Sequence, residues 1–160
     1  EHIEEVRYWR NSDSVKNFMI YRAEISEKEQ AYWFEKVNNR ANFYFVIQAG
    51  NLGNIGLVNL NDVDYENKTA EYGIFMFGEK YQGSTYTPKA VFAMLDFGFK
   101  DLKLEKITCN ILATNTPAIK FNKSLGFEIT ETTNKSVVNG ILQKSVFSEK
   151  LIKYHKILNR

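Results

Sequence analysis

The sequence predicts a mixed α/β protein in which helices flank one sheet. Three observations predict this class: helical hydrophobic spacing near the N-terminus, a run of short apolar strands after it, and strands that alternate with helices from there on. At 160 residues the chain is long enough to bury one sizeable core. Because no repeat or low-complexity segment divides it, we expect a single domain over residues 1–160.

Helical segments open the chain. Hydrophobic residues recur at a three-residue spacing over residues 3–9, which predicts a helix, and a short second helical piece follows it. Ser26 and Glu29 have the spacing of a capping box, which predicts the start of a further helix. Trp33 and Phe34 lie on the predicted buried face of that helix, so we expect a helical hairpin before the sheet.

Strands and helices then alternate. In order, we predict strands at 43–47, 55–60 and 71–77, a helix at 85–102, a strand at 107–112 and a helix at 116–125. Pro117 and Gly126 flank the last of these helices as helix termini prefer. Two extended segments follow, and Asn139-Gly140 between them predicts a hairpin turn. The basic tail, residues 151–160, is predicted to be a frayed helix or a linker.

Composition excludes several classes of function. A net charge of +2 and a pI of 8.6, without a basic stripe, argue against nucleic-acid binding. Cys109 is the single cysteine, and the two histidines are far apart in sequence, so we expect neither a disulfide nor a metal site. No run approaches the roughly 18 apolar residues of a membrane span, and no secretory signal opens the chain. We therefore expect a cytoplasmic protein with no membrane partner.

The segment from Ala70 to Leu95 has the layout of a phosphate-binding site. An apolar strand leads through a polar loop with Gly83 and Ser84 into a helix. The first N–H groups of a helix lack partners inside the helix, and the helix dipole adds positive charge there, so such an end binds phosphate. An ordinary connection without a ligand is an equally good interpretation of this segment alone.

A second segment decides between these two interpretations. Its distinctive residues are Asn115, Thr116-Pro117, Ala118-Ile119, Phe121 and Leu125-Gly126-Phe127. Together with the strand, loop and helix before it, this pattern resembles the Gcn5-related N-acetyltransferase (GNAT) superfamily over essentially the whole chain. The resemblance implies a mixed, mostly antiparallel sheet with about four helices, and acetyl-coenzyme A as co-substrate without a metal. The family's first strand would lie upstream of Glu1, so we expect the chain to be one domain of a longer protein.

The resemblance also assigns the residues that bind acetyl-coenzyme A. They are Phe75, Met76, Phe77, Gln82, Gly83, Ser84, Thr85, Tyr86, Thr87, Asn115 and Phe121. Backbone N–H groups near residues 75–77 are expected to polarise the acetyl carbonyl. The loop departs from the family pattern, because Thr85 and Thr87 occupy two positions that are usually glycine or alanine. Their side chains make close approach of the backbone harder, although their hydroxyls add donors.

The N-terminal segment carries a more specific resemblance. Its residues are Trp9-Arg10-Asn11, Val15, Phe18-Met19, Ile25-Ser26 and Trp33-Phe34. They are similar to the acetyltransferases that modify a 4-amino sugar on UDP in pseudaminic acid biosynthesis, and more weakly to the Nα-acetyltransferases of ribosomal proteins. The residues that this assigns to the acceptor are Arg10, Asn11, Met19, Tyr21 and Gln30. The guanidinium of Arg10 would pair with a diphosphate, or would instead cap the first helix.

Two residues are assigned to catalysis. Glu71, on the strand beside the cofactor, is the candidate base for the acceptor amine, with a strand-end salt bridge as its alternative role. Asn122 occupies the position where many members of the superfamily carry a tyrosine as the acid for the leaving thiolate. A thiol has a pKa of about 8.5, so a thiolate can leave near neutral pH with a hydrogen bond alone.

These residues predict an acetyl-coenzyme A-dependent N-acetyltransferase that acts directly on the amine of a nucleotide-linked amino sugar of the UDP-4-amino-4,6-dideoxy type. One alternative is an Nα-acetyltransferase for a protein N-terminus. Another is a non-catalytic module that binds acyl-coenzyme A or a partner enzyme, which the two threonines and the missing tyrosine favour. We expect a monomer or a homodimer.

Overall fold

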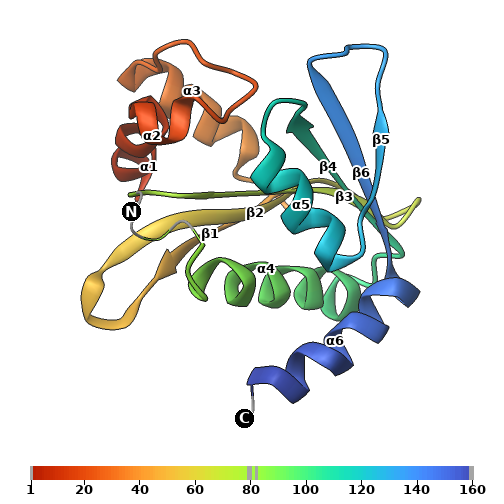
Figure 1. Cartoon of the computed structure of the whole chain (residues 1–160). Helices are drawn as coiled ribbons and strands as arrows, with labels where there is room; N and C mark the ends of the chain where they lie inside the picture. The colour runs from red at the N-terminus through yellow and green to blue at the C-terminus, as the bar shows by residue number, and fades with distance from the viewer. Residues whose placement is uncertain (1, 79–80, 82, 159–160) are drawn as a thin grey trace.

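The computed structural model describes residues 2–78, 81 and 83–158. One six-stranded sheet carries helices on both faces (Figure 1). The helices are α1 (Ile3–Asn11), α2 (Asp13–Lys16), α3 (Glu27–Val37), α4 (Tyr86–Asp96), α5 (Thr116–Leu125) and α6 (Lys144–Leu158). The strands are β1 (Phe43–Gln48), β2 (Asn54–Asp64), β3 (Thr69–Met76), β4 (Lys106–Leu112), β5 (Glu128–Glu131) and β6 (Val137–Gln143). The mixed α/β class is confirmed, with more helices than the four expected.

The sheet has the order β1-β2-β3-β4-β6-β5, and its neighbours are antiparallel except for β3 and β4. These two strands run parallel because the helix α4 crosses over between them. Their ladder contains only three residue pairs and ends where Glu71 lies opposite Thr108. Beyond that pair β3 and β4 separate, so the middle of the sheet has a gap that opens toward the C-terminal ends of both strands.

Each face of the sheet has its own hydrophobic core. Helices α4 and α5 and the start of α6 pack on one face, where Leu95, Ile107 and Leu142 are fully buried. Helices α1 and α2 pack on the other face, where Trp9 stacks on Phe77 with ring centroids 5.6 Å apart. Figure 1 shows α1–α3 above the sheet and α4 and α6 below it. None of the helices in the described ranges is long and apolar enough to cross a membrane.

Local signals in the sequence fix several helix ends. The capping box at Ser26 is confirmed, because Glu29 N–H donates to the Ser26 hydroxyl and the Glu29 carboxylate accepts from Ser26 N–H at 2.8 Å. Asn115 caps α5 by accepting from Ala118 N–H at 3.2 Å. Gly126 ends α5 with a left-handed φ of 103°, which glycine adopts without strain.

The predicted hairpin turn at Asn139-Gly140 is wrong. Both residues lie inside β6, and residues 132–136 make the connection from β5. Gly140 lies between Cys109 of β4 and Ile129 of β5, and a Cβ on it would lie 2.6 Å from Cys109 Sγ. The glycine therefore serves close packing in the sheet. Two predicted boundaries also differ: β2 runs on to Asp64, past the predicted end at residue 60, and the C-terminal helix begins at Lys144, before the predicted tail at 151–160.

A substitution at Gly56 tests the packing of β2 against β3. A Cβ at this position would meet the backbone carbonyl oxygen of Phe75, which cannot move without breaking the ladder. We expect Gly56→Ala to lower the free energy of unfolding in urea by about 1–3 kcal/mol. Gly73→Ala is the matched control, because the atoms nearest to its new methyl group belong to the side-chain amide of Asn59, the closest at 2.9 Å, and a side chain can rotate where a backbone cannot. Equal urea midpoints for the two variants would contradict this account of the strand contact.

Candidate active site

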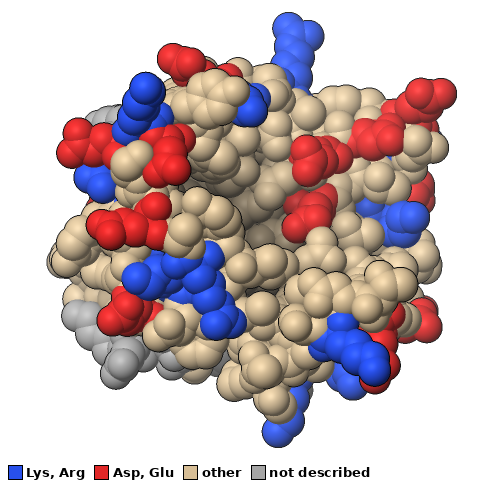
Figure 2. Space-filling model, turned by 90° about the horizontal axis from the view of Figure 1, so that it is seen from above, with Lys and Arg blue, Asp and Glu red and all other residues tan. Residues whose placement is uncertain are grey.

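A cavity of about 620 Å³ lies where β3 and β4 separate. Its lining comes from α1, the segment between α2 and α3, α3 itself, strands β1–β4 and α5. Seen from above, the molecule is hollowed near the middle of this face, with acidic side chains along one rim and basic side chains at another (Figure 2). The cavity is therefore reached from the side that carries the N-terminal helices.

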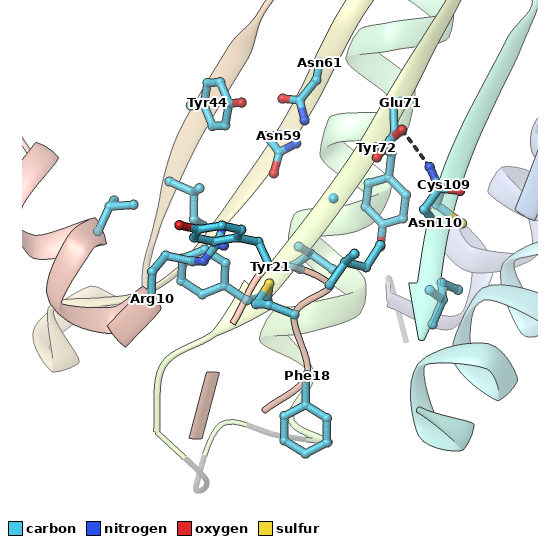
Figure 3. A pocket seen from close by; sticks show the side chains of 18 of the residues that line it. Arg10, Phe18, Tyr21, Tyr44, Asn59, Asn61, Glu71, Tyr72, Cys109 and Asn110 are labelled. Carbon is cyan, nitrogen blue, oxygen red and sulfur yellow. Dashed lines mark hydrogen bonds between the residues drawn. The ribbon is translucent and has the colours of Figure 1, made fainter. Parts of the chain in front are cut away.

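Glu71 lies at the end of the parallel ladder and faces the cavity (Figure 3). Its carboxylate accepts a hydrogen bond from the Asn110 side-chain amide at 2.8 Å. Burial raises the pKa of Glu71 above its ordinary value; the Asn110 bond opposes this effect and the charge of Asp62 adds to it. No cation among the described residues forms an ion pair with Glu71. The carboxylate is thus held in place and has the raised proton affinity of a general base.

The hydrogen bond from Asn110 tunes this carboxylate. Because the bond stabilises the charged form, its removal in Asn110→Ala is expected to raise the pKa of Glu71 further. If Glu71 is the base, the acidic limb of the pH profile of kcat/KM then moves to higher pH. The measurement is kcat/KM as a function of pH, over a range from about pH 5 to about pH 9. If Asn110→Ala stays active and its acidic limb does not move, Glu71 is not the group whose ionisation sets that limb.

Arg10 reaches the cavity from the last turn of α1, on the side away from Glu71 (Figure 3). Among the residues that the structure describes it forms neither an ion pair nor a hydrogen bond, and its Nε is fully buried. Burial lowers the pKa of Arg10, and Tyr44 and Tyr21 lie beside it. Burial also raises the pKa of Tyr44 to about 12, so its hydroxyl is neutral near neutral pH. Arg10 is therefore an uncompensated cation available to an anionic ligand.

The cavity has a second side, which faces α5. Alternation along β3 places Tyr72 on the opposite face of the sheet from Glu71, among the core residues that α4 and α5 cover. Cys109 of β4 and Asn122 of α5 lie on this side too, with Cys109 Sγ 4.0 Å from Asn122 Oδ1. Burial raises the pKa of Cys109 to about 12, so its thiol is not a nucleophile near neutral pH. The cavity therefore connects both faces of the sheet through the gap.

The edge of β3 offers free backbone groups to this gap. Phe77 N–H donates to Ile55 at 2.8 Å, so by alternation the N–H groups of Phe75 and Phe77 point toward β2. Of the backbone groups near residues 75–77 that were expected to polarise the acetyl carbonyl, those of Phe75 and Phe77 therefore point away from the gap. The N–H groups of Ile74 and Met76 instead face the gap, past the end of the ladder with β4. An extended chain with amide groups can pair there as a strand would, and the pantetheine arm of acetyl-coenzyme A is such a chain.

The described residues of the loop before α4 do not line the cavity, and Gln82 lies outside the described residues. Gly83 has a φ of 75°, and apart from its chain neighbours no described residue has a heavy atom within 4 Å of the place of its Cβ. The Ser84 hydroxyl donates to the Tyr81 carbonyl at 2.6 Å, and the exposed Thr85 precedes α4 without capping it. The Thr87 hydroxyl is buried and has no partner among the described residues. An unpartnered hydroxyl at an uncapped helix start suits a phosphate, so the loop remains our prediction for the phosphate end of the cofactor.

The other residues assigned to the cofactor divide between the cavity and the core. Asn115 and Phe75 line the cavity. The remaining side chains are Met76, which is buried, Phe77, which packs on α1, and Tyr86 and Phe121, which are partly buried beside the α4–α5 core. Of these four residues, Met76 lies at the gap, where its backbone and not its side chain is placed to contact an extended cofactor.

The residues assigned to the acceptor also divide. Arg10, Met19, Tyr21 and Gln30 line the cavity. Asn11 does not: its side chain donates to Ile25 C=O and accepts from Ile25 N–H, both at 2.8 Å. These bonds fix the end of α1 to the segment before α3, which is a structural role.

Sequence reasoning missed several lining residues, namely Tyr44, Asn59, Asn61, Tyr72 and Asn110. All of them lie on strands, at positions that alternation assigns to one face or the other of the sheet. Their gathering depends on which strands pair and where β3 leaves β4. A polar residue inside an apolar strand, such as Asn59 or Asn110, was the one local signal that could have marked them.

Comparisons with known proteins agree with this geometry. The model of the acetyltransferase (GNAT) domain matches residues 1–128. The chain is 27% identical over 128 residues to a spermidine N(1)-acetyltransferase of Vibrio cholerae, which covers 77% of this chain and 73% of that protein. It is 36% identical over 74 residues to the uncharacterized N-acetyltransferase p20 of Bacillus licheniformis. That match covers 46% of this chain and spans only 41% of the relative.

A solved structure shows the same fold. The spermidine N-acetyltransferase of Vibrio cholerae, in complex with CoA and spermine, superposes with a TM-score of 0.79 at 21% identity. The superposition covers 92% of this chain and 92% of that one. Because the family model matches residues 1–128, which is most of this chain, the chain belongs to the acetyltransferase (GNAT) family, a family of acyltransferases.

Proposed function

We propose that this chain transfers the acetyl group of acetyl-coenzyme A directly to a primary amine of a small molecule. The observation that carries this proposal is the gap between β3 and β4, with a carboxylate of raised pKa at its closed end and free backbone groups along its edge. An extended thioester substrate fits along β3, and the acceptor amine fits beside Glu71. Family membership supports the same reaction.

The chemistry assigned to the side chains is limited to moving a proton and placing the reactants. Glu71 takes a proton from the acceptor amine, directly or through a water molecule, so that the nitrogen has a free electron pair. A C–N bond forms at the carbonyl carbon, the C–S bond breaks, and the electron pair of that bond goes to sulfur. The proton that the nitrogen must still lose to become an amide goes to water. The N–H groups of Ile74 and Met76, which face the gap, are the backbone donors available to the bound thioester.

The charges in the cavity favour an acceptor that carries an anion as well as an amine. Glu71 lies on one side, and the unpaired guanidinium of Arg10 lies on the other. A nucleotide-linked amino sugar combines both groups, since its diphosphate can pair bidentately with arginine. Tyr21 and Met19 add an apolar surface for the sugar or base. We therefore place the UDP-4-amino-4,6-dideoxy sugars first among the acceptors.

A polyamine is the second candidate. Relatives from Vibrio cholerae and Escherichia coli are named as spermidine N(1)-acetyltransferases. The match to the Escherichia coli protein is 25% identical over 157 residues and covers 86% of this chain and 83% of that protein. The carboxylates of Glu29 and Glu71 line the cavity and could bind ammonium groups. Against this, a polycation would place like charge near Arg10, whose own charge has no partner among the described residues.

Release of thiol from acetyl-coenzyme A tests these acceptors against one another. The panel contains UDP-linked amino sugars, spermidine and peptides with free N-termini, each at several concentrations. We expect the highest kcat/KM with an amino sugar that keeps its diphosphate. Turnover only with spermidine would transfer the assignment to polyamines, and turnover only with peptides to a protein N-terminus. Binding of acetyl-coenzyme A without turnover on the whole panel would favour the non-catalytic module.

A further inference from the structure

A buried phenol lies at the gap, in the part of the cavity that faces α5. The side chain of Tyr72 is 3% exposed, and its hydroxyl has no hydrogen-bond partner among the residues that the structure describes. A buried hydroxyl without a partner is unfavourable, so its presence calls for a ligand or a special role. Figure 3 shows the ring between strands β3 and β4, where they separate.

The surroundings fix this ring firmly. It packs on Phe127 with centroids 5.8 Å apart, and its neighbour on the next strand is Cys109. Asn122, at the position where many members of the superfamily carry a tyrosine, lies on the same side of the sheet. The amide nitrogen of Asn122 donates one of its two N–H groups to Ala118 C=O at 2.9 Å, so only the other remains for a ligand. Tyr72 is a donor on this side of the gap that forms no hydrogen bond with any described residue.

We propose that the Tyr72 hydroxyl donates a hydrogen bond to the sulfur of the thioester and to the thiolate that leaves. This assignment rests on the proposed acetyl transfer. In that reaction the C–N bond forms, the C–S bond breaks and its electron pair goes to sulfur, while the amine proton goes to Glu71 or water. The phenol keeps its own proton throughout, so the atoms and electrons balance without a further acid. Tyr72 on β3 thereby takes over the role of the tyrosine missing from α5.

The chemistry of the phenol agrees with a donor that is not an acid. Burial, with a smaller effect of Cys109, raises the pKa of Tyr72 well above its ordinary value. A thiol has a pKa of about 8.5, so net proton transfer from this phenol to a thiolate is unfavourable. A hydrogen bond to an anionic acceptor in a buried site is nevertheless strong. It is stronger with the thiolate than with the thioester, which is the difference that accelerates the reaction.

Binding of coenzyme A and of desulfo-coenzyme A, which lacks the sulfur, tests this assignment apart from turnover. Dissociation constants are measured by calorimetry at neutral pH and at a pH where the thiol is ionised. We expect Tyr72→Phe to weaken the binding of the coenzyme A thiolate about tenfold or more and to leave desulfo-coenzyme A unchanged. The same variant should lower kcat by about tenfold or more, with little change in the KM for the acceptor.

Two controls keep the result interpretable. Tyr65→Phe removes a hydroxyl that donates to Arg40 C=O at 2.6 Å on the surface, away from the cavity, and should change neither affinity. Tyr72→Phe itself removes an unpartnered polar atom and should unfold at the same temperature as the parent or higher. Equal losses for both ligands, or no loss for either, overturns the role of Tyr72 while the proposed function stands. Failure of the parent chain to bind coenzyme A overturns both.

Discussion

Glu71→Gln is expected to lower kcat/KM by about two to four orders of magnitude, because it removes the group that takes the proton from the acceptor amine. The neutral side chain keeps the size of the glutamate and can still accept a hydrogen bond from the Asn110 amide, which the carboxylate accepts at 2.8 Å. The loss should therefore lie mainly in kcat, with the affinity for acetyl-coenzyme A preserved. Steady-state kinetics with the best acceptor of the panel measure it.

The pH profile identifies the same group. A base must be ionised to act, and burial raises the pKa of Glu71 above the ordinary value of 4.5. Activity is therefore expected to fall on the acidic side at a pH above that of an exposed glutamate. In Glu71→Gln this limb should disappear from the residual activity. Glu66→Gln, at an exposed position outside the cavity, is the matched control and should keep both rate and profile. Full activity with an unchanged limb in Glu71→Gln would remove the residue from catalysis.

The sequence predicted the fold well because its signals are local. Hydrophobic spacing, the capping box at Ser26 and the Pro117 and Gly126 helix ends all act within one turn or strand, and the structure has each of them. The error at Asn139-Gly140 has the opposite origin. That dipeptide favours a turn locally, but Gly140 is required because strands on both sides leave no room for a side chain. Strand pairing overrode the local preference.

The site was less predictable because it depends on where two strands separate. Glu71 and Arg10 were found from the resemblance and their residue types, yet their placement on different sides of one cavity is a property of the sheet and α1. Asn110 and Tyr72 gave no motif: one is an exposed polar residue on a strand and the other looks like a core aromatic. Both residues become candidate site residues only because the β3–β4 ladder ends after three residue pairs, which opens the gap beside them.

Arg10→Met is expected to raise the KM for an acceptor that carries a diphosphate by about a hundredfold, because the half-buried cation that pairs with the anion is lost. Methionine keeps an apolar stem of similar length. Since Arg10 has no ionic partner among the described residues, the empty protein loses no ion pair and should be at least as stable to heat. Kinetics with the nucleotide-linked amino sugar and with spermidine measure the change for both candidate acceptors.

The two acceptors separate the possible roles of Arg10. If the guanidinium pairs with an anion, the KM for the amino sugar rises while that for spermidine stays the same or falls, because a nearby positive charge has been removed. Arg10→Lys keeps the charge but loses the planar fork, so its effect should be intermediate. Arg40→Met, at an exposed position outside the cavity, should change neither constant. A rise in KM for both acceptors, with a lower melting temperature, would instead assign Arg10 to the structure of α1. If the KM for the amino sugar does not change, Arg10 does not bind the anion of the acceptor, and the polyamine becomes the favoured acceptor.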